Sequence, residues 1–130
     1  NIVCGGDGDL ELRSIHPTIM TDVPANATIM GEETFGPILN IFTYKDVNEA
    51  IIAIQQQPKP LALYIFTSDD EFSEMVLSKT SSGGVTVNGC LMHVAVPGMP
   101  FGGVNSSGIG AYHGIFGFRE LSHQRSVLFM

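Results

Sequence analysis

Apolar runs and helically spaced apolar residues alternate through the middle of the chain. The run 38–44 (ILNIFTY) is rich in β-branched and aromatic side chains, which is typical of a strand. Asp46 and Glu49 follow it as a variant of the capping box that begins helices. Pro58 and Pro60 end the predicted helix because proline cannot continue its hydrogen bonds. The apolar face of this helix, at spacings of three and four residues, consists of Val47, Ala50, Ile51 and Ile54.

The same alternation is repeated once further along the chain. The nearly continuous apolar run 61–67 (LALYIFT) predicts a strand that is covered on both faces. Ser68 and Glu71 repeat the capping-box arrangement before a second helix, and 85–88 (VTVN) predicts a third strand. The order β-α-β-α-β over residues 38–88 therefore predicts an α/β fold with a parallel core, because connections of this length suit right-handed crossovers.

The segments on either side of this core are less regular. Residues 1–34 predict irregular β structure, with strand-like pieces at 10–15 and 18–21. Residues 89–117 are rich in glycine and also contain methionine, phenylalanine, valine and tyrosine, so we expect a long, ordered loop that lines a site. Asn88 would place this loop at the carboxyl ends of the strands, where ligands bind in open parallel sheets. Residues 122–130 predict a closing strand that pairs with another chain.

Composition changes this picture in two ways. The chain has 130 residues, with 6 basic and 13 acidic side chains and a net charge of −7, so nucleic acid is a poor partner. Charged residues make up only 15% and hydrophobic residues 44%, which is undercharged for a domain of this size. We therefore expect a piece of a larger protein, or a subunit that buries much of its surface; the alternative is an ordinary, slightly apolar domain.

Targeting signals and cysteine usage favour a reducing compartment. Cys4 and Cys90 are too few for a disulfide scaffold, and their spacing matches no zinc motif, so we expect no metal. The sequence opens without a signal peptide, and no apolar run approaches the roughly 20 residues that span a bilayer. We expect a cytoplasmic location.

Few residues offer reactive chemistry, and each has a structural alternative. The glycines around Gly108 superficially resemble a dinucleotide-binding loop but lack its spacing. His93, His113 and His123 occur singly, which favours structural histidines over metal ligands. No neighbouring base is evident that could deprotonate Cys90 to a thiolate, which favours a packing role for this residue.

The segment 32–37 (EETFGP) is more specific. A carboxylate beside an aromatic ring can hold a ribose diol and cover a flat heterocycle. A surface acid next to a core phenylalanine is an equally open explanation of the same residues.

At these residues the chain resembles the aldehyde dehydrogenase superfamily. Residues 32–37 are similar to its E-E-x-F-G-P signature, and 100–110 (PFGGVNSSGIG) to its P-F-G-G…S-G-x-G loop. The class 3 branch is matched most closely by the segments 59–64 (KPLALY), 80–85 (TSSGGV), 111–114 (AYHG) and 122–125 (SHQR). The resemblance implies that residues 1–121 are the C-terminal part of the catalytic domain, and that residues 122–130 are an oligomerisation strand.

The resemblance also implies a reaction and roles for individual residues. Members of the family oxidise aldehydes to carboxylic acids with NAD or NADP, through a cysteine thioester. The position of Glu33 contacts the nicotinamide ribose, and that of Phe35 packs beside the nicotinamide. The aldehyde channel would be bordered by Phe101 and flanked by Leu91, Val94 and His113, while Asn88 would support the loop from the strand end.

Three departures from the family pattern limit what this chain would do alone. Neither Cys4 nor Cys90 lies in a G-Q-x-C motif, the E-L-G-G-K segment with the glutamate base is absent, and so is the Rossmann-like cofactor domain. We therefore expect the isolated chain to be inactive, and its partners to be the remainder of its own chain, an aldehyde and a second copy in a homodimer. The alternatives are a binding or interaction module that has kept the fold, and another activity of the superfamily such as acyl-phosphate reduction.

Overall fold

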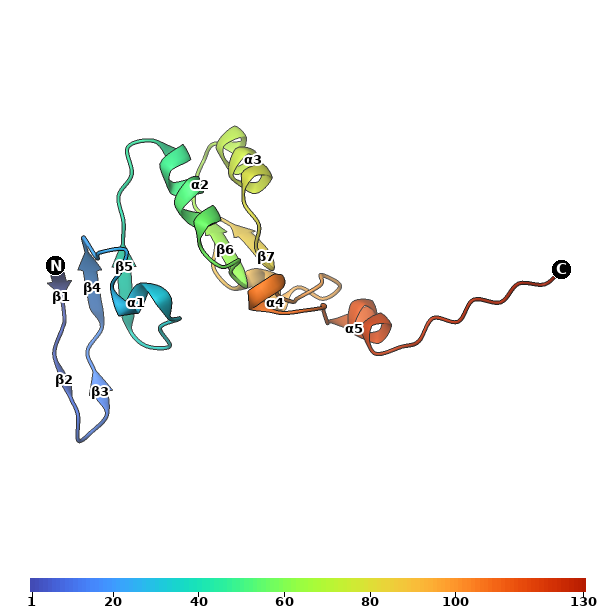
Figure 1. The fold of residues 1–130 in the computed structure, drawn as a ribbon, viewed down its shortest axis with the longest axis horizontal. Coiled ribbons are helices and arrows are strands. Elements are labelled where there is room, and N and C mark those ends of the chain that lie inside the picture. The colour runs from blue at the N-terminus through green and yellow to red at the C-terminus, as the bar shows by residue number, and fades with distance from the viewer. The chain divides into compact units, whose positions relative to one another are not determined.

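The computed structural model describes all residues from Asn1 to Met130, and they form two compact units (Figure 1). The N-terminal unit comprises Asn1–Lys45 and the C-terminal unit Asp46–Met130. No helix in either unit has the length and apolar character that crossing a membrane requires.

The N-terminal unit is built on a three-stranded mixed sheet in the order β1-β4-β5. Strand β4 (Thr18–Thr21) pairs antiparallel with β1 (Ile2–Cys4) and parallel with β5 (Ile38–Ile41). Thr18 at the start of β4 is only 5% exposed. Its hydroxyl accepts a hydrogen bond from the Gly6 amide at 3.0 Å and donates one to the His16 carbonyl at 2.8 Å, so this buried polar group is satisfied.

The strand predicted at residues 18–21 is confirmed, whereas the one predicted at 10–15 is confirmed only at 14–15. Residues 10–13 form the turn between the short strands β2 (Gly8–Asp9) and β3 (Ser14–Ile15). The Asp9 carboxylate accepts from the amides of Glu11 and Leu12 at 2.8 and 2.9 Å, which folds the chain back at this point. A short helix, α1 (Thr28–Gly31), follows β4.

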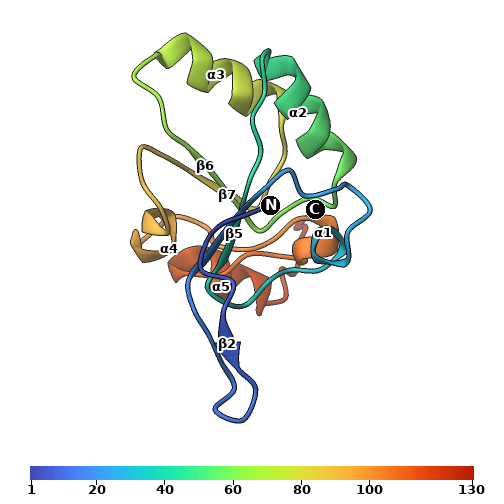
Figure 2. The same ribbon diagram turned by 90° about the vertical axis from the view of Figure 1, so that its left-hand side faces the viewer.

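In the C-terminal unit, helices α2 (Val47–Gln56) and α3 (Asp70–Lys79) lie on the same side of two parallel strands (Figure 2). The strands are β6 (Ala62–Ile65) and β7 (Gly84–Val87), with Ala62 opposite Gly84 and Ile65 opposite Val87. The core on this side is formed by the buried Ile51, Ile65 and Val76 and by the partly buried Val47, Leu63, Phe72, Met75 and Val85.

The opposite side of β6 and β7 is covered as well. Side chains alternate along a strand, so Ala62, Tyr64, Gly84 and Thr86 face away from α2 and α3. Helix α4 (Met92–Ala95) packs on that side, with His93 buried against it. The predicted cover on both faces of β6 is present in part, since Tyr64 contacts His93 but Ala62 and Tyr64 stay half-buried.

The α/β class with parallel strands is confirmed, but β5 pairs differently from the expected single core. It pairs with β4 in the N-terminal unit and not with β6 or β7. The amide of Thr18 donates to the carbonyl of Pro37 at 2.8 Å, just before the two strands begin their register. The choice of a strand partner is a long-range property, which the apolar pattern of the strand alone does not specify.

The predicted start of the first helix is confirmed, and that of the second is wrong by one residue. Asp46 caps α2 by accepting from the Asn48 amide at 2.9 Å. Helix α3 is capped by Asp69 and not by Ser68, since the Asp69 carboxylate accepts from the Phe72 amide at 3.2 Å. A carboxylate at this place also interacts favourably with the positive end of the helix dipole.

Asp69→Ala should therefore destabilise helix α3 by about 1 kcal/mol, the usual effect of losing an N-cap. Faster amide hydrogen exchange in α3 of the full-length protein would measure this. Ser68→Ala is the matched control and should leave the exchange rates unchanged. Equal effects of the two substitutions would contradict the assignment of the cap.

The prediction of one long loop over residues 89–117 is wrong in part. Helix α4, a 3-10 helix η1 (Asn105–Ser107) and helix α5 (Gly114–Glu120) interrupt it. These helices have three to seven residues, too few for an apolar periodicity to be recognised. Residues 122–130 pair with no strand in this chain, and the predicted pairing with another chain stays a prediction.

Candidate functional site

His93 is the buried centre of the face of β6 and β7 that α4 covers. Its side chain is 5% exposed, and its Nδ1 shares a hydrogen bond of 2.9 Å with Thr86 Oγ1. The edge of the imidazole lies directly on Gly84, where an added Cβ would come within 2.5 Å of His93 Cδ2. Glycine at position 84 therefore allows the edge of the histidine ring to approach the strand backbone this closely.

An aromatic cluster extends from this histidine toward Phe101. We define it as Tyr64, His93, Phe101, Tyr112 and His113. The Phe101 ring centroid lies 5.8 Å from His93 and 5.8 Å from His113, and the ring is stacked on His113 with an interplanar angle of 20°. Tyr112 meets both Phe101 and His113 edge-on, which is a favourable geometry for aromatic pairs.

The backbone around Phe101 forms a tightly packed glycine loop, which we define as residues 100–112. Phe101 and Tyr112 pair as an antiparallel bridge, with N–O distances of 3.0 and 2.9 Å. An added Cβ on Gly102 would collide with the carbonyl of Gly110, and one on Gly103 with the carbonyl of Ser107. Glycines at these positions allow the two arms of the loop to lie against each other.

The glycine loop does not lie at the carboxyl ends of the strands, where the sequence placed it. A Cβ on Gly83 would meet the carbonyls of Leu61 and Gly102, so the loop packs beside the residues that precede β6 and β7. Helix α4 carries the chain from the carboxyl ends back across the face of the strands. The prediction holds for Asn88 and the residues that directly follow it, and is wrong for Phe101.

Asn88 ties the carboxyl ends of β6 and β7 together. Its side-chain Oδ1 accepts from the Thr67 amide at 3.0 Å, and its own amide donates to the Ile65 carbonyl at 2.7 Å. Asn88 and Leu91 both have positive φ angles, 56° and 61°. This backbone directs the chain into α4, with Leu91 exposed at the N-terminus of the helix and Val94 half-buried within it.

Glu33 and Phe35 lie in the N-terminal unit, between α1 and β5. Both side chains are exposed, and the Phe35 ring is 91% exposed. The backbone after them is fixed, because the Pro37 carbonyl accepts from β4 and the Ile38 amide donates to Gly36. A carboxylate can accept hydrogen bonds from a diol and an exposed ring can cover a heterocycle, so both side chains are accessible for the roles that the resemblance implies.

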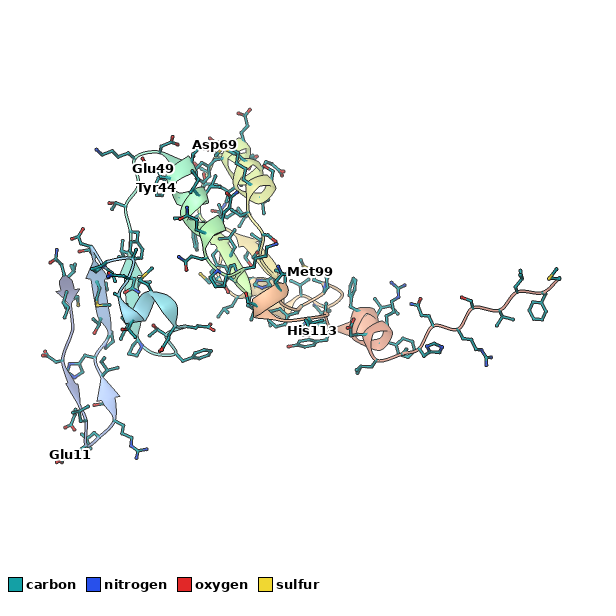
Figure 3. All side chains as sticks on the ribbon, viewed as in Figure 1. Glu11, Tyr44, Glu49, Asp69, Met99 and His113 are labelled. Atoms are coloured by element: carbon teal, nitrogen blue, oxygen red, sulfur yellow. The ribbon has the colours of Figure 1, made fainter.

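Figure 3 draws all side chains and labels His113, whose φ of 86° is unusual for a residue with a side chain. Among the sequence-predicted residues, the structure brings Phe101 and His113 into ring contact. It places Asn88, Leu91 and Val94 on the segment from β7 into α4. The sequence analysis did not identify His93, which contacts both Phe101 and strand β7. The signal that could have indicated it is in β7, where Gly84 leaves space for a ring and Thr86, on the same face, offers a hydroxyl.

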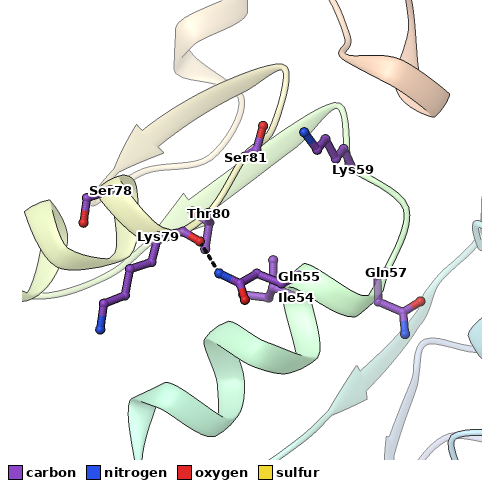
Figure 4. Close-up of a pocket in the computed structure, with 8 residues that line it drawn as sticks. All are labelled: Ile54, Gln55, Gln57, Lys59, Ser78, Lys79, Thr80 and Ser81. Atoms are coloured by element: carbon purple, nitrogen blue, oxygen red, sulfur yellow. Dashed lines mark hydrogen bonds between the residues drawn. The ribbon is translucent and has the colours of Figure 1, made fainter.

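The C-terminal unit has hollows beside the glycine loop and between its two longest helices. One of about 360 Å³ lies beside the glycine loop, between Leu61, Phe101, Ile109 and Glu120 among others. The other, of about 190 Å³, lies between the ends of α2 and α3 (Figure 4). There Gln55 Nε2 donates to the Lys79 carbonyl at 2.7 Å, and the Thr80 hydroxyl donates to the Val76 carbonyl. Several of its polar groups thus already bond to the chain itself, and we assign this hollow no binding role.

The two cysteines and the other ionisable groups form no further centre. Cys4 and Cys90 are exposed free thiols, so the packing role expected for Cys90 is wrong. Nowhere in the chain do three or more histidine, cysteine, aspartate or glutamate side chains gather closely enough to hold a metal ion.

Comparison with known proteins gives consistent matches over nearly the whole chain. The model of the aldehyde dehydrogenase family matches residues 1–127. The chain is 47% identical over 129 residues to 4,4'-diaponeurosporen-aldehyde dehydrogenase of Staphylococcus aureus, covering 99% of this chain and 28% of that protein. It is 52% identical over 127 residues to aldehyde dehydrogenase family 3 member A2 of Rattus norvegicus, covering 98% and 26%.

Solved structures match the fold in the same way. Staphylococcus aureus AldH in a substrate-bound state superposes with a TM-score of 0.88 at 44% identity, covering 100% of this chain and 30% of that one. A Mycobacterium tuberculosis aldehyde dehydrogenase complexed with NAD+ gives 0.86 at 33% identity, covering 99% and 27%. The chain thus spans between a quarter and a third of these relatives.

Proposed function

The chain belongs to the aldehyde dehydrogenase family, and from this premise we propose that it forms part of an NAD(P)-dependent enzyme that oxidises aldehydes to carboxylic acids. The proposal is carried by the structure of the glycine loop, which contains the segment that resembles the P-F-G-G…S-G-x-G loop of the family. Its close-packed glycines hold the Phe101 ring against His113. A rigid loop that presents an aromatic pair is suited to border a substrate channel.

The coenzyme side of the site is assigned to the N-terminal unit. Glu33 would accept hydrogen bonds from the ribose hydroxyls, and the exposed Phe35 ring would pack beside the nicotinamide. NAD or NADP supplies the acceptor for the hydride that leaves the substrate. The relatives support both coenzymes, since a Bos taurus relative is described as dimeric and NADP-preferring and the M. tuberculosis structure contains NAD+.

The aldehyde side is assigned to the C-terminal unit. Phe101 and His113 would form one wall of the channel, and Leu91 and Val94, at the start of α4 and within it, would flank it. These mostly apolar side chains would exclude water around the carbonyl and favour medium-chain or aromatic aldehydes. Asn88 would support the segment by joining the ends of β6 and β7.

The attacking cysteine and the general base are assigned to the remainder of the parent protein, outside these 130 residues. The parent's second copy is the proposed partner of residues 122–130, where Val127, Leu128 and Phe129 are 60, 84 and 91% exposed. A reducing, cytoplasmic compartment is part of the proposal, supported by the two exposed free thiols.

The test is an assay of the purified full-length parent with an aliphatic and an aromatic aldehyde and with NAD and NADP in turn. We expect one mole of carboxylic acid for each mole of reduced coenzyme. The 130-residue chain alone, assayed in parallel, should give no turnover. A parent that binds coenzyme or aldehyde without oxidising the aldehyde would instead support the binding-module alternative.

A further inference from the structure

We propose that His93 is a positioning residue for the aldehyde side of the site, because it joins Phe101 and helix α4 to the face of β6 and β7. The inference rests on the proposed function only in assigning Phe101 to the aldehyde channel. The contacts of His93 themselves are independent of that assignment.

The histidine ring is fixed on three sides. One edge lies on the backbone of Gly84, and the Nδ1 atom is held by Thr86 at 2.9 Å. The Tyr64 ring lies 6.1 Å from the imidazole, measured between centroids. All three contacts come from the same face of the two strands, so the plane of the imidazole is set by the sheet.

This fixed ring in turn touches Phe101, with centroids 5.8 Å apart and planes inclined at 39°. The other two ring partners of Phe101 are Tyr112 and His113, which belong to the far arm of the glycine loop or directly follow it. They hold Phe101 relative to the loop itself. Among the ring contacts of Phe101, His93 is the one that ties it to the strands.

His93 also determines where α4 lies. This helix has only four residues, so its own hydrogen bonds contribute little to its stability. His93 is the one buried side chain of α4; Leu91 caps the start of the helix two residues before His93, and Val94 directly follows His93. The position of both proposed channel residues therefore depends on how His93 is seated.

The choice of histidine over an apolar ring supports a role in orientation. The Nε2 atom is buried and has no hydrogen-bond partner, which is unfavourable for a polar group. A phenylalanine would fill this space without the unpaired nitrogen, but it could form no hydrogen bond with Thr86 to fix its rotation. A histidine at this position is explained if its hydrogen bond with Thr86 fixes the orientation of the imidazole plane against which Phe101 packs.

The experiment compares Thr86→Val and His93→Phe with the unaltered full-length parent. The readout is the ratio of kcat/KM for benzaldehyde to that for acetaldehyde, which does not depend on the fraction of folded enzyme. We expect both variants to change this ratio by about tenfold, since small displacements of a channel wall affect a bulky substrate more than a small one. Thr86→Val keeps the shape of the side chain and serves even where His93→Phe fails to fold.

Thr80→Val is the matched control, because it also removes one partly buried hydroxyl hydrogen bond in the same unit. It should leave the ratio unchanged. A ratio within about twofold of the parent's in Thr86→Val would overturn the proposal, since it would mean that His93 only fills space.

Crystal structures of the parent and of Thr86→Val separate this inference from the proposed function. If the parent oxidises neither aldehyde, the proposed function fails, and the position of Phe101 still decides the role of His93. A displaced or rotated Phe101 ring in Thr86→Val supports the inference, and an unmoved ring overturns it.

Discussion

Glu33→Gln in the full-length parent should lower kcat/KM for the coenzyme by about 10- to 100-fold and leave the melting temperature unchanged. A carboxylate that accepts hydrogen bonds from a ribose diol contributes about 1.5–3 kcal/mol, and glutamine loses the charge that strengthens these bonds. The fold should tolerate the change because Glu33 is exposed and contributes nothing to the buried core. Steady-state kinetics with the coenzyme varied, together with thermal unfolding, measures both quantities.

Glu32→Gln is the matched control for this substitution. Glu32 is the neighbouring residue, is exposed and has the same charge, so replacing it changes the surface potential equally. It should reduce kcat/KM by less than about twofold, since exposed charges contribute little at ordinary ionic strength. Equal kinetics for the parent and Glu33→Gln would count against the ribose role.

Local signals predicted the two longest helices of this chain, α2 and α3, well. Asp46 and the apolar face that begins at Val47 are close neighbours in sequence, and both the cap and the helix form as expected. The second helix forms too, and its start moves by one residue because Asp69 and Ser68 are both good caps and competed for the position.

Local signals could not predict which strands pair, nor that α4 leads the chain from the carboxyl ends of β6 and β7 back across their face. β5 pairs with β4, which is 20 residues earlier in register, and no local pattern encodes that choice. The path of the chain across the strands depends on α4, which has only four residues, and on the contact of His93 with Gly84 in β7. His93 and Gly84 are brought next to each other only when β6 and β7 have paired and α4 has folded back over them.

The site residues illustrate the same division. The motifs around Glu33 and Phe101 were recognised as letters at fixed spacings, yet the spacings alone did not explain why glycine is needed at 102 and 103. The structure supplies the reason, because two arms of backbone approach there more closely than any side chain allows. His93 lies outside every recognised motif, so only its contacts indicate a role.

Gly103→Ala in the full-length parent should destabilise the glycine loop by about 3 kcal/mol or more and reduce kcat/KM for aldehydes by at least about tenfold. The new methyl group would collide with the carbonyl and carbon of Ser107 and with the amide of Gly108, all of which are backbone atoms. Ser107 cannot yield easily, since its hydroxyl accepts from the Val104 amide at 2.9 Å and donates to the Val104 carbonyl at 3.0 Å. The loop would have to open, and Phe101 would lose the backbone that positions it.

Amide hydrogen exchange of residues 100–112 measures the opening, and the same kinetics measure its effect on the substrate. Gly117→Ala is the matched control in the same unit. An added Cβ there would lie 3.4 Å from Tyr112 Cβ, which is ordinary contact, and alanine is favoured over glycine inside a helix by about 1 kcal/mol. Gly117→Ala should therefore keep or raise stability and leave the kinetics unchanged. Normal exchange protection in Gly103→Ala would show that the two arms are not closely packed, and the structural basis for a rigid Phe101 would be lost with it.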